Sequence, residues 1–259
     1  MCTYIKLGNL VLPSYSLMIA LGIMLSYGIA AIHCWKKSLS YKNVLILAGF
    51  GIGFGLIGAK VLFLIVSYKE IAWSHIFELR YFLILLRAGY VFYGGLIFSI
   101  IAIVISAKIF KINLREYLLE FVYLIPFAQA FGRIGCFMAG CCYGRPYDGP
   151  FAVVFPEETF GLAGVKLFPI QIVEAIFLLM ISFIVFIIII NGKRCYSLSV
   201  YFILYAILRF ILEYYRYDYV RGFVLGLSTS QWISVFIFVV GVVLSFANVI
   251  RNKRQIKNK

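Results

Sequence analysis

The sequence has little charge and little histidine. Only 13% of its 259 residues are charged, whereas about a quarter of the residues of a soluble domain carry charge. This shortage excludes an ordinary water-soluble surface. The two histidines, His33 and His75, stand far from the cysteine-rich segment in sequence, which disfavours a metal site of cysteine and histidine ligands. The chain also lacks the internal repeat of broken helices that marks many transporters.

Apolar residues are abundant instead, at 64% of the chain. They form blocks of about 20 residues, the length that crosses a bilayer. A span must satisfy its own backbone hydrogen bonds, so these blocks are predicted to be helices. The predicted fold class is an all-α integral membrane protein with seven transmembrane helices, one polytopic domain over residues 1–259. The predicted spans are Ser14–Trp35, Asn43–Ser67, Val91–Ile109, Tyr117–Phe131, Phe168–Ile190, Leu198–Leu212 and Trp232–Val249.

The fourth and sixth spans are short, so they are tilted, extended by flanking residues or partly re-entrant. Basic residues gather at alternate ends of the spans, and the positive-inside rule makes that side cytoplasmic. The amino terminus is therefore predicted outside and the carboxyl terminus inside. The basic residues of this side are Lys36, Lys37, Lys42, Lys108, Lys111, Arg115, Lys193, Arg194, Arg251, Lys253, Arg254, Lys257 and Lys259.

The net charge of +14 is thus mainly a topology signal. Because the basic residues are scattered among span ends and not gathered on one face, nucleic-acid binding is not expected. Residues 250–259 are predicted to form a basic cytoplasmic tail in contact with anionic lipid headgroups. The first span runs directly into Lys36 and Lys37, as a stop-transfer segment does, and a cleaved signal peptide is not expected.

The second span, with the run GFGIGFGLIGAK, is rich in glycine. Small residues let helices approach closely, which favours a packing face over a groove for an acyl chain. Lys60 ends this run, and either reaches the interface or pairs with a carboxylate. Arg87 stands in LLRAGYVFYGG, before aromatic residues and a glycine pair. Ionisable groups at membrane depth are costly and usually functional.

Other polar residues recur at helical spacing. Gln171 and Glu174 lie three apart on one face of the fifth span. In the segment 205–218, polar side chains three and four apart form one stripe on a predicted helix. The stripe contains Tyr205, Arg209, Glu213 and Arg216 or Tyr217. It is either an internal salt-bridge ladder or, as we favour, part of a site for an anionic phospholipid, because the arginine fork matches phosphate oxygens.

Three cysteines lie together in the run GRIGCFMAGCCYG of residues 132–144, which is predicted to open the longest outward loop. Cys136, Cys141 and Cys142 are open to three interpretations: a redox set, a metal site or small packing residues. The distant histidines disfavour a metal, an oxidising outer face permits a disulfide, and buried free thiols are the favoured state. Further along the loop, FAVVFP is predicted to form a strand or an interfacial hairpin.

This run resembles the signature of the prolipoprotein diacylglyceryl transferases, whose usual form is close to GRIGNFxNGExxG. LRAGYVFYGG resembles that family's GGxxxHGG, LFPIQIVEA its HPTQLYE, and LRFILEYYRYD its RxxxEFFRxPD. SYSLM, with Tyr15, resembles the start of the family's first span. The motifs keep the family's order and cover nearly the whole chain. Seven spans with an outer amino terminus also agree with the family.

The resemblance implies a bacterial inner-membrane enzyme that faces outward and uses no cofactor and no metal. It transfers the diacylglyceryl group of phosphatidylglycerol to a cysteine thiol of a lipobox preprotein, forming a thioether and releasing glycerol phosphate. Its partners are phosphatidylglycerol, lipobox preproteins and membrane lipids. The implied catalytic residues are Arg133, Arg209, Tyr93 and Tyr15. The implied lipid-binding residues are Arg133, Arg209, Arg216, Glu213, Tyr205, Gly94, Gly95, Gln171 and Glu174.

The chain departs from the family pattern at several polar positions. Tyr93 replaces a histidine, and tyrosine, with a pKa near 10 against about 6.5, is the weaker base. Cys136 and Cys141 replace asparagine and glutamate, and Phe168 and Val173 replace histidine and tyrosine. Three hypotheses follow: a transferase with Tyr93 or substrate-assisted chemistry, a paralogue with another acceptor or a cysteine nucleophile, and a noncatalytic lipid binder or transporter.

Overall fold

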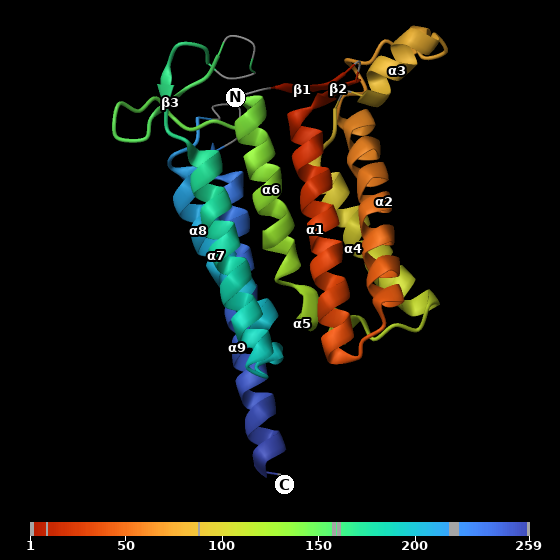
Figure 1. Cartoon of the computed structure of the whole chain (residues 1–259), viewed down its shortest axis with the longest axis vertical. Coiled ribbons are helices and arrows are strands. Elements are labelled where there is room, and N and C mark those ends of the chain that lie inside the picture. Colours follow the sequence, from red (N-terminus) through yellow and green to blue (C-terminus); the bar gives the residue numbers. More distant parts are fainter. Residues whose placement is uncertain are drawn as a thin grey trace. The chain divides into compact units, whose positions relative to one another are not determined.

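The computed structural model describes residues 3–8, 10–87, 89–156, 159, 162–217 and 223–257. Six helices in these residues are long and apolar enough to cross a membrane (Figure 1). The predicted helical membrane protein is therefore confirmed, while its orientation stays a prediction. The six are α1 (Ser14–Lys37), α2 (Tyr41–Val66), α4 (Phe92–Ile109), α7 (Ile170–Ile190), α8 (Ser197–Glu213) counted with the short turn before it as Arg194–Glu213, and α9 (Thr229–Lys257).

The fourth predicted span is a bent pair of helices, α5 (Leu114–Phe121) and α6 (Leu124–Ala139). Their axes differ by 52°, and as one span they bring the number to seven. The predicted end of this span at Phe131 is wrong, because α6 continues to Ala139. The helix continues through Gly135, where the missing side chain lets α1 pack closely. The chain leaves the helix at Gly140, whose φ is 73°, the left-handed value that glycine favours.

One compact unit comprises residues 1–29 and 118–259. In it α6 packs against α7, α7 against α8 and α8 against α9 (Figure 1). Glu120, buried at the α5 end, accepts a 2.8 Å hydrogen bond from Arg194 in η2 (Arg194–Tyr196). The core is aliphatic over the length of the helices and includes Val122, Ala130, Ile170, Leu178, Val185 and Ile189.

Three two-stranded antiparallel sheets in the described residues join the helices. The predicted strand in FAVVFP is confirmed as β3. The loop from α6 to α7 is held to the end of α8, because Gly144 forms an antiparallel bridge with Arg216. A Cβ atom at Gly144 would lie 2.5 Å from the Phe168 carbonyl oxygen, so this contact requires glycine. The sheets are β1 (Tyr4–Leu7) with β2 (Leu10–Pro13), β3 (Val153–Val154) with β4 (Lys166–Leu167), and β5 (Phe223–Val224) with β6 (Leu227–Ser228).

The other compact unit, residues 30–117, contains α2, η1 (Trp73–His75), α3 (Leu79–Arg87) and α4. Glycines form the seam between α2 and α4. A Cβ at Gly58 would lie 2.6 Å from the Gly94 carbonyl oxygen, and one at Gly94 would lie 2.3 Å from that of Gly58. The favoured interpretation of the glycine-rich span as a packing face is confirmed for this side. Gly49 and Gly53 lie on the opposite side of α2 and line an apolar groove.

The ammonium group of Lys60 donates hydrogen bonds to the carbonyl oxygens of Leu85 and Gly89, and it lies over the rings of Phe63 and Tyr90. Its two predicted roles, reaching the interface and pairing with a carboxylate, stay predictions. The side chain of Arg87 lies outside the described residues.

The glycine seam leads to a stability prediction. Gly58→Ala is expected to lower the free energy of unfolding by about 1–3 kcal/mol, because the new methyl group overlaps α4. Gly53→Ala is the matched control on the same helix. It has no atom within 4 Å of its new Cβ, and is expected to gain about 0.5–1 kcal/mol from reduced backbone freedom. Thermal unfolding of both variants in detergent measures the difference, and equal midpoints would contradict the seam.

Candidate active site

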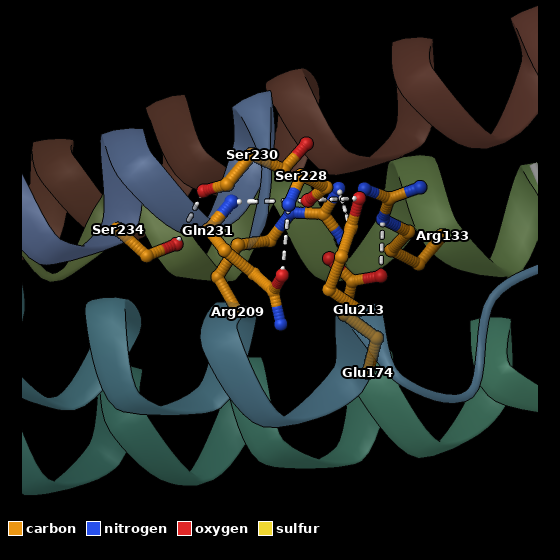
Figure 2. A network of polar contacts seen from close by, with 8 residues as sticks. All are labelled: Arg133, Glu174, Arg209, Glu213, Ser228, Ser230, Gln231 and Ser234. Carbon is orange, nitrogen blue, oxygen red and sulfur yellow. Dashed lines mark hydrogen bonds and ion pairs between the residues drawn. The ribbon is translucent and has the colours of Figure 1, made fainter. Parts of the chain in front are cut away.

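Two arginine–glutamate pairs lie inside the unit formed by α6, α7, α8 and α9. The Nε atom of Arg133 on α6 is 3.0 Å from Oε2 of Glu174 on α7. The Nη2 atom of Arg209 is 3.1 Å from Oε2 of Glu213, one turn along α8. Figure 2 shows the four side chains converging from three helices. The two carboxylates are almost fully buried, at 3% and 7% exposure, so the pairs hold both guanidinium groups in fixed directions.

Glu213 has a second partner that the sequence reasoning missed. Ser228, in β6, donates a 3.0 Å hydrogen bond from Oγ to Oε1 of Glu213 (Figure 2). Ser228 also caps α9: its N–H donates to Oε1 of Gln231, and the N–H of Gln231 donates to its Oγ. This is the capping box of a Ser-x-x-Gln sequence. The sequence pattern thus signals the cap, but not the contact with Glu213.

The predicted polar stripe on the sixth span is only partly correct. Arg209 and Glu213 share one face of α8, as expected. The helix ends at Glu213, however, and Arg216 lies beyond it in the bridge with Gly144. Arg216 therefore reaches the site from an extended segment, because the loop after α6 pairs with the chain there.

Some buried polar atoms at this site have no hydrogen-bond partner among the described residues. They are Nη1 of Arg209, Oε1 of Gln129 and Oε1 of Gln171. Gln129, on α6, was not predicted, although an amide at membrane depth is itself a signal. A buried donor without an acceptor costs stability unless a ligand satisfies it. Nη1 of Arg209 is therefore the atom most in need of an external acceptor.

Among the described residues, the site gathers three arginines and two glutamates. Arg133, Arg209 and Arg216 interact electrostatically with one another or with the two glutamates. A group of arginines suits an anion such as a phosphodiester.

The three cysteines form a cluster at the end of α6. Their sulfur atoms all lie within 4.8 Å of one another, and none is in a disulfide. The N–H groups of Gly140 and Cys141 donate to the carbonyls of Phe137 and Cys136, the pattern of a Schellman motif. This turn carries Cys141 back beside Cys136. Cys142 follows with a left-handed φ of 55°, which is uncommon for a residue with a side chain.

Neighbouring groups change the acidity of the two loop thiols. Hydrogen bonds from Cys136 and Cys141 lower the pKa of Cys142, burial opposes this, and the charges of Arg216 and Arg133 add to the lowering. For Cys141, the hydrogen bond with Cys136 lowers the pKa, but that with Cys142 and burial raise it more, to about 11. The favoured state of buried free thiols is confirmed in part: Cys136 is buried, while the other two are half-buried.

The remaining predicted residues fall into two groups. Gln171 donates a 2.8 Å hydrogen bond to the Cys141 carbonyl, and Tyr205 lies within electrostatic range of Arg133 and Arg209. Tyr15, at the start of α1, lies beside Gly135 and within electrostatic range of the thiols. Tyr93, Gly94 and Gly95 belong to the other compact unit. There the two glycines pack against α2, and their role in lipid binding stays a prediction.

The chain matches known proteins over most of its length. The family model described as prolipoprotein diacylglyceryl transferase matches residues 3–247. A phosphatidylglycerol–prolipoprotein diacylglyceryl transferase of Clostridium tetani is 35% identical over 240 residues, 92% of this chain and 93% of the relative. A second enzyme of this name from Clostridium perfringens is 32% identical, over 95% of this chain and 94% of its own. One from Finegoldia magna is 28% identical over 93% and 92%.

Proposed function

Because the chain belongs to the prolipoprotein diacylglyceryl transferase family, we propose that it transfers the diacylglyceryl group of phosphatidylglycerol to a lipobox cysteine. The acceptor sulfur forms a thioether with the glyceryl carbon, and the phosphate ester bond to that carbon breaks. Glycerol phosphate is the other product. The donor is a membrane lipid and the acceptor a membrane-anchored preprotein, so a multi-pass membrane protein suits both substrates.

The observation that carries this proposal is the buried Nη1 atom of Arg209, which has no hydrogen-bond partner in the described part of the chain. The Glu213 carboxylate holds the opposite nitrogen of the same guanidinium group, which fixes the direction in which Nη1 donates. A phosphate oxygen is the acceptor that best matches such a fork. Arg133, held in the same way by Glu174, supplies a second fixed cation beside it.

The charge of the reacting phosphate explains why more than one arginine is needed. The phosphodiester of the substrate has one negative charge, and the leaving glycerol phosphate has two. Donors that are already oriented stabilise this developing charge without reorganisation. We assign Arg133 and Arg209 to the phosphate and Arg216 to the leaving group. Tyr205 and Tyr15 provide further donors for the lipid, and Oε1 of Gln171 provides an acceptor. Tyr93, Gly94 and Gly95 are assigned to the lipid and the reaction on the resemblance to the family alone.

The reaction is expected at the outer face of the bacterial cell membrane. With the predicted orientation, the end of α6 and the loop that pairs with Arg216 lie outside. A lipobox preprotein presents its cysteine at that face. The site thus lies where both substrates meet.

Rescue of a cell depleted of its own transferase tests the proposal. The chain is expected to restore the diacylglyceryl group on lipobox proteins, detected by labelling with a fatty acid and by mass spectrometry. Stable insertion without any such modification would refute the transferase activity. In that case phosphatidylglycerol binding by the purified protein would favour the noncatalytic binder, and labelling of another acceptor would favour the paralogue.

A further inference from the structure

The three thiols have no part in the phosphate binding proposed above, and together they present a set of possible metal ligands. In the described part of the chain, Cys136, Cys141 and Cys142 form a group of possible metal ligands, because their sulfur atoms all lie within 4.8 Å of one another. The Schellman turn and the left-handed Cys142 create this convergence. A disulfide would join two of the sulfurs and leave the third as a thiol, whereas one metal ion can bind all three.

The spacing suits a tetrahedral thiolate site. Zn–S bonds of about 2.3 Å place tetrahedral sulfurs about 3.8 Å apart, so the three thiols need to close by about 1 Å at most. Cys141 and Cys142 are half-buried loop residues, and a change of about 1 Å is within the reach of a side-chain torsion. A zinc ion with three protein ligands keeps a fourth position for a water molecule or a substrate.

The surrounding charge also suits such a site. Three thiolates and one zinc ion carry a net charge of minus one. Arg133 lies three residues before Cys136, on the same side of α6. Arg216 is paired with Gly144, two residues after Cys142. Both cations act on Cys142 electrostatically, so they offset the negative charge of a zinc–thiolate centre.

The proposed reaction needs a thiolate. A cysteine thiol has a pKa of about 8.5 and attacks as the thiolate. The two carboxylates described at the site, those of Glu174 and Glu213, are both engaged by arginines. A thiol that coordinates zinc loses its proton outright.

We propose that Cys136, Cys141 and Cys142 bind a zinc ion whose fourth position takes the thiol of the lipobox cysteine as a thiolate. This rests on the proposed function and names the device that activates its acceptor. Binding releases the thiol proton to water. The zinc-bound sulfur then attacks the glyceryl carbon, the C–S bond forms, and the electrons of the breaking C–O bond pass to the phosphate oxygen near the arginines.

Cobalt(II) is the probe for this site, because cobalt bound to thiolates in a tetrahedral site has intense visible absorption. The reduced, purified full-length protein is expected to bind a single Co²⁺ with sulfur-to-cobalt charge-transfer bands. A lipobox peptide is expected to change the visible bands, and the same peptide with serine for cysteine is not. Cys136→Ser, Cys141→Ser and Cys142→Ser should each weaken binding about tenfold or more.

Cys195→Ser is the matched control, since Cys195 is in no disulfide and lies in η2, beyond the far end of α7 from the cluster. Its cobalt spectrum should equal that of the parent. Phosphatidylglycerol binding, retained in the three cluster variants, shows that they are folded. Absence of thiolate bands in the parent, or a spectrum unaffected by the cysteine peptide, overturns the proposal.

Transfer assays separate this inference from the proposed function. Removal of zinc with a chelator should lower the rate of transfer about 10²-fold or more, and added Zn²⁺ should restore it. Equal rates with and without zinc overturn the zinc site and leave the transferase activity intact. A cobalt site that responds to the lipobox peptide, in a protein that never transfers lipid, supports the metal site and refutes the transferase.

Discussion

Arg209→Ala is expected to lower the rate of diacylglyceryl transfer by about 10²–10³-fold, the effect of removing one oriented donor from a developing oxyanion. Arg209 presents the buried Nη1 atom that has no acceptor among the described residues. Without Arg209, the phosphate loses the guanidinium group that is oriented to donate to it. Transfer to a lipobox peptide by the purified variant, in vesicles of phosphatidylglycerol, measures the rate.

Arg209→Lys distinguishes the fork from the charge alone. Lysine keeps the positive charge but cannot bind Glu213 and a phosphate oxygen in one plane, so an intermediate rate is expected. Arg115→Ala is the control for loss of an arginine, because Arg115 is exposed on α5. Equal transfer rates for Arg209→Ala, Arg115→Ala and the parent protein would show that Arg209 has no part in the reaction.

Arg133→Met is expected to affect both stability and transfer. It leaves the Glu174 carboxylate, which is 3% exposed, without its cation, at a cost of about 3 kcal/mol or more. Arg133→Met with Glu174→Leu removes both charges and is expected to recover most of that stability. Transfer should stay about 10²–10³-fold lower in both variants, because the phosphate lacks the same cation.

Thermal unfolding in detergent and the peptide transfer assay give the two readouts. A structural role for Arg133 predicts that the double variant regains activity together with stability. The binding role predicts recovery of stability alone. Activity in the stabilised double variant would therefore remove Arg133 from the site.

The sequence predicted the helices and the paired charges because both depend on local spacing. Apolar blocks of bilayer length located all the long helices, and residues four apart on a helix must share a face, as Arg209 and Glu213 do. The resemblance assigned Arg133 and Glu174 to the same lipid site, but it did not predict that they pair. Helical spacing within each span does not itself determine which spans pack together.

Features that depend on tertiary contacts were not predictable in this way. The close packing of Gly135 against Tyr15 and Met18, which lie on another helix, is one such feature. Arg216 enters the site through its bridge with Gly144. The bond from Ser228 to Glu213 joins elements that no sequence period relates. The same holds for the thiols. Cys136 and Cys141 are five residues apart and Cys142 follows directly, and the turn after α6 brings the three together.

Mass spectrometry of a lipobox peptide tests the central claim most directly. The peptide is incubated with the purified protein and phosphatidylglycerol, with a serine peptide beside it. The account predicts that the cysteine peptide gains one diacylglyceryl group and that glycerol phosphate appears in equal amount, while the serine peptide is unchanged. An unmodified cysteine peptide, with a folded protein that binds phosphatidylglycerol, would contradict the account.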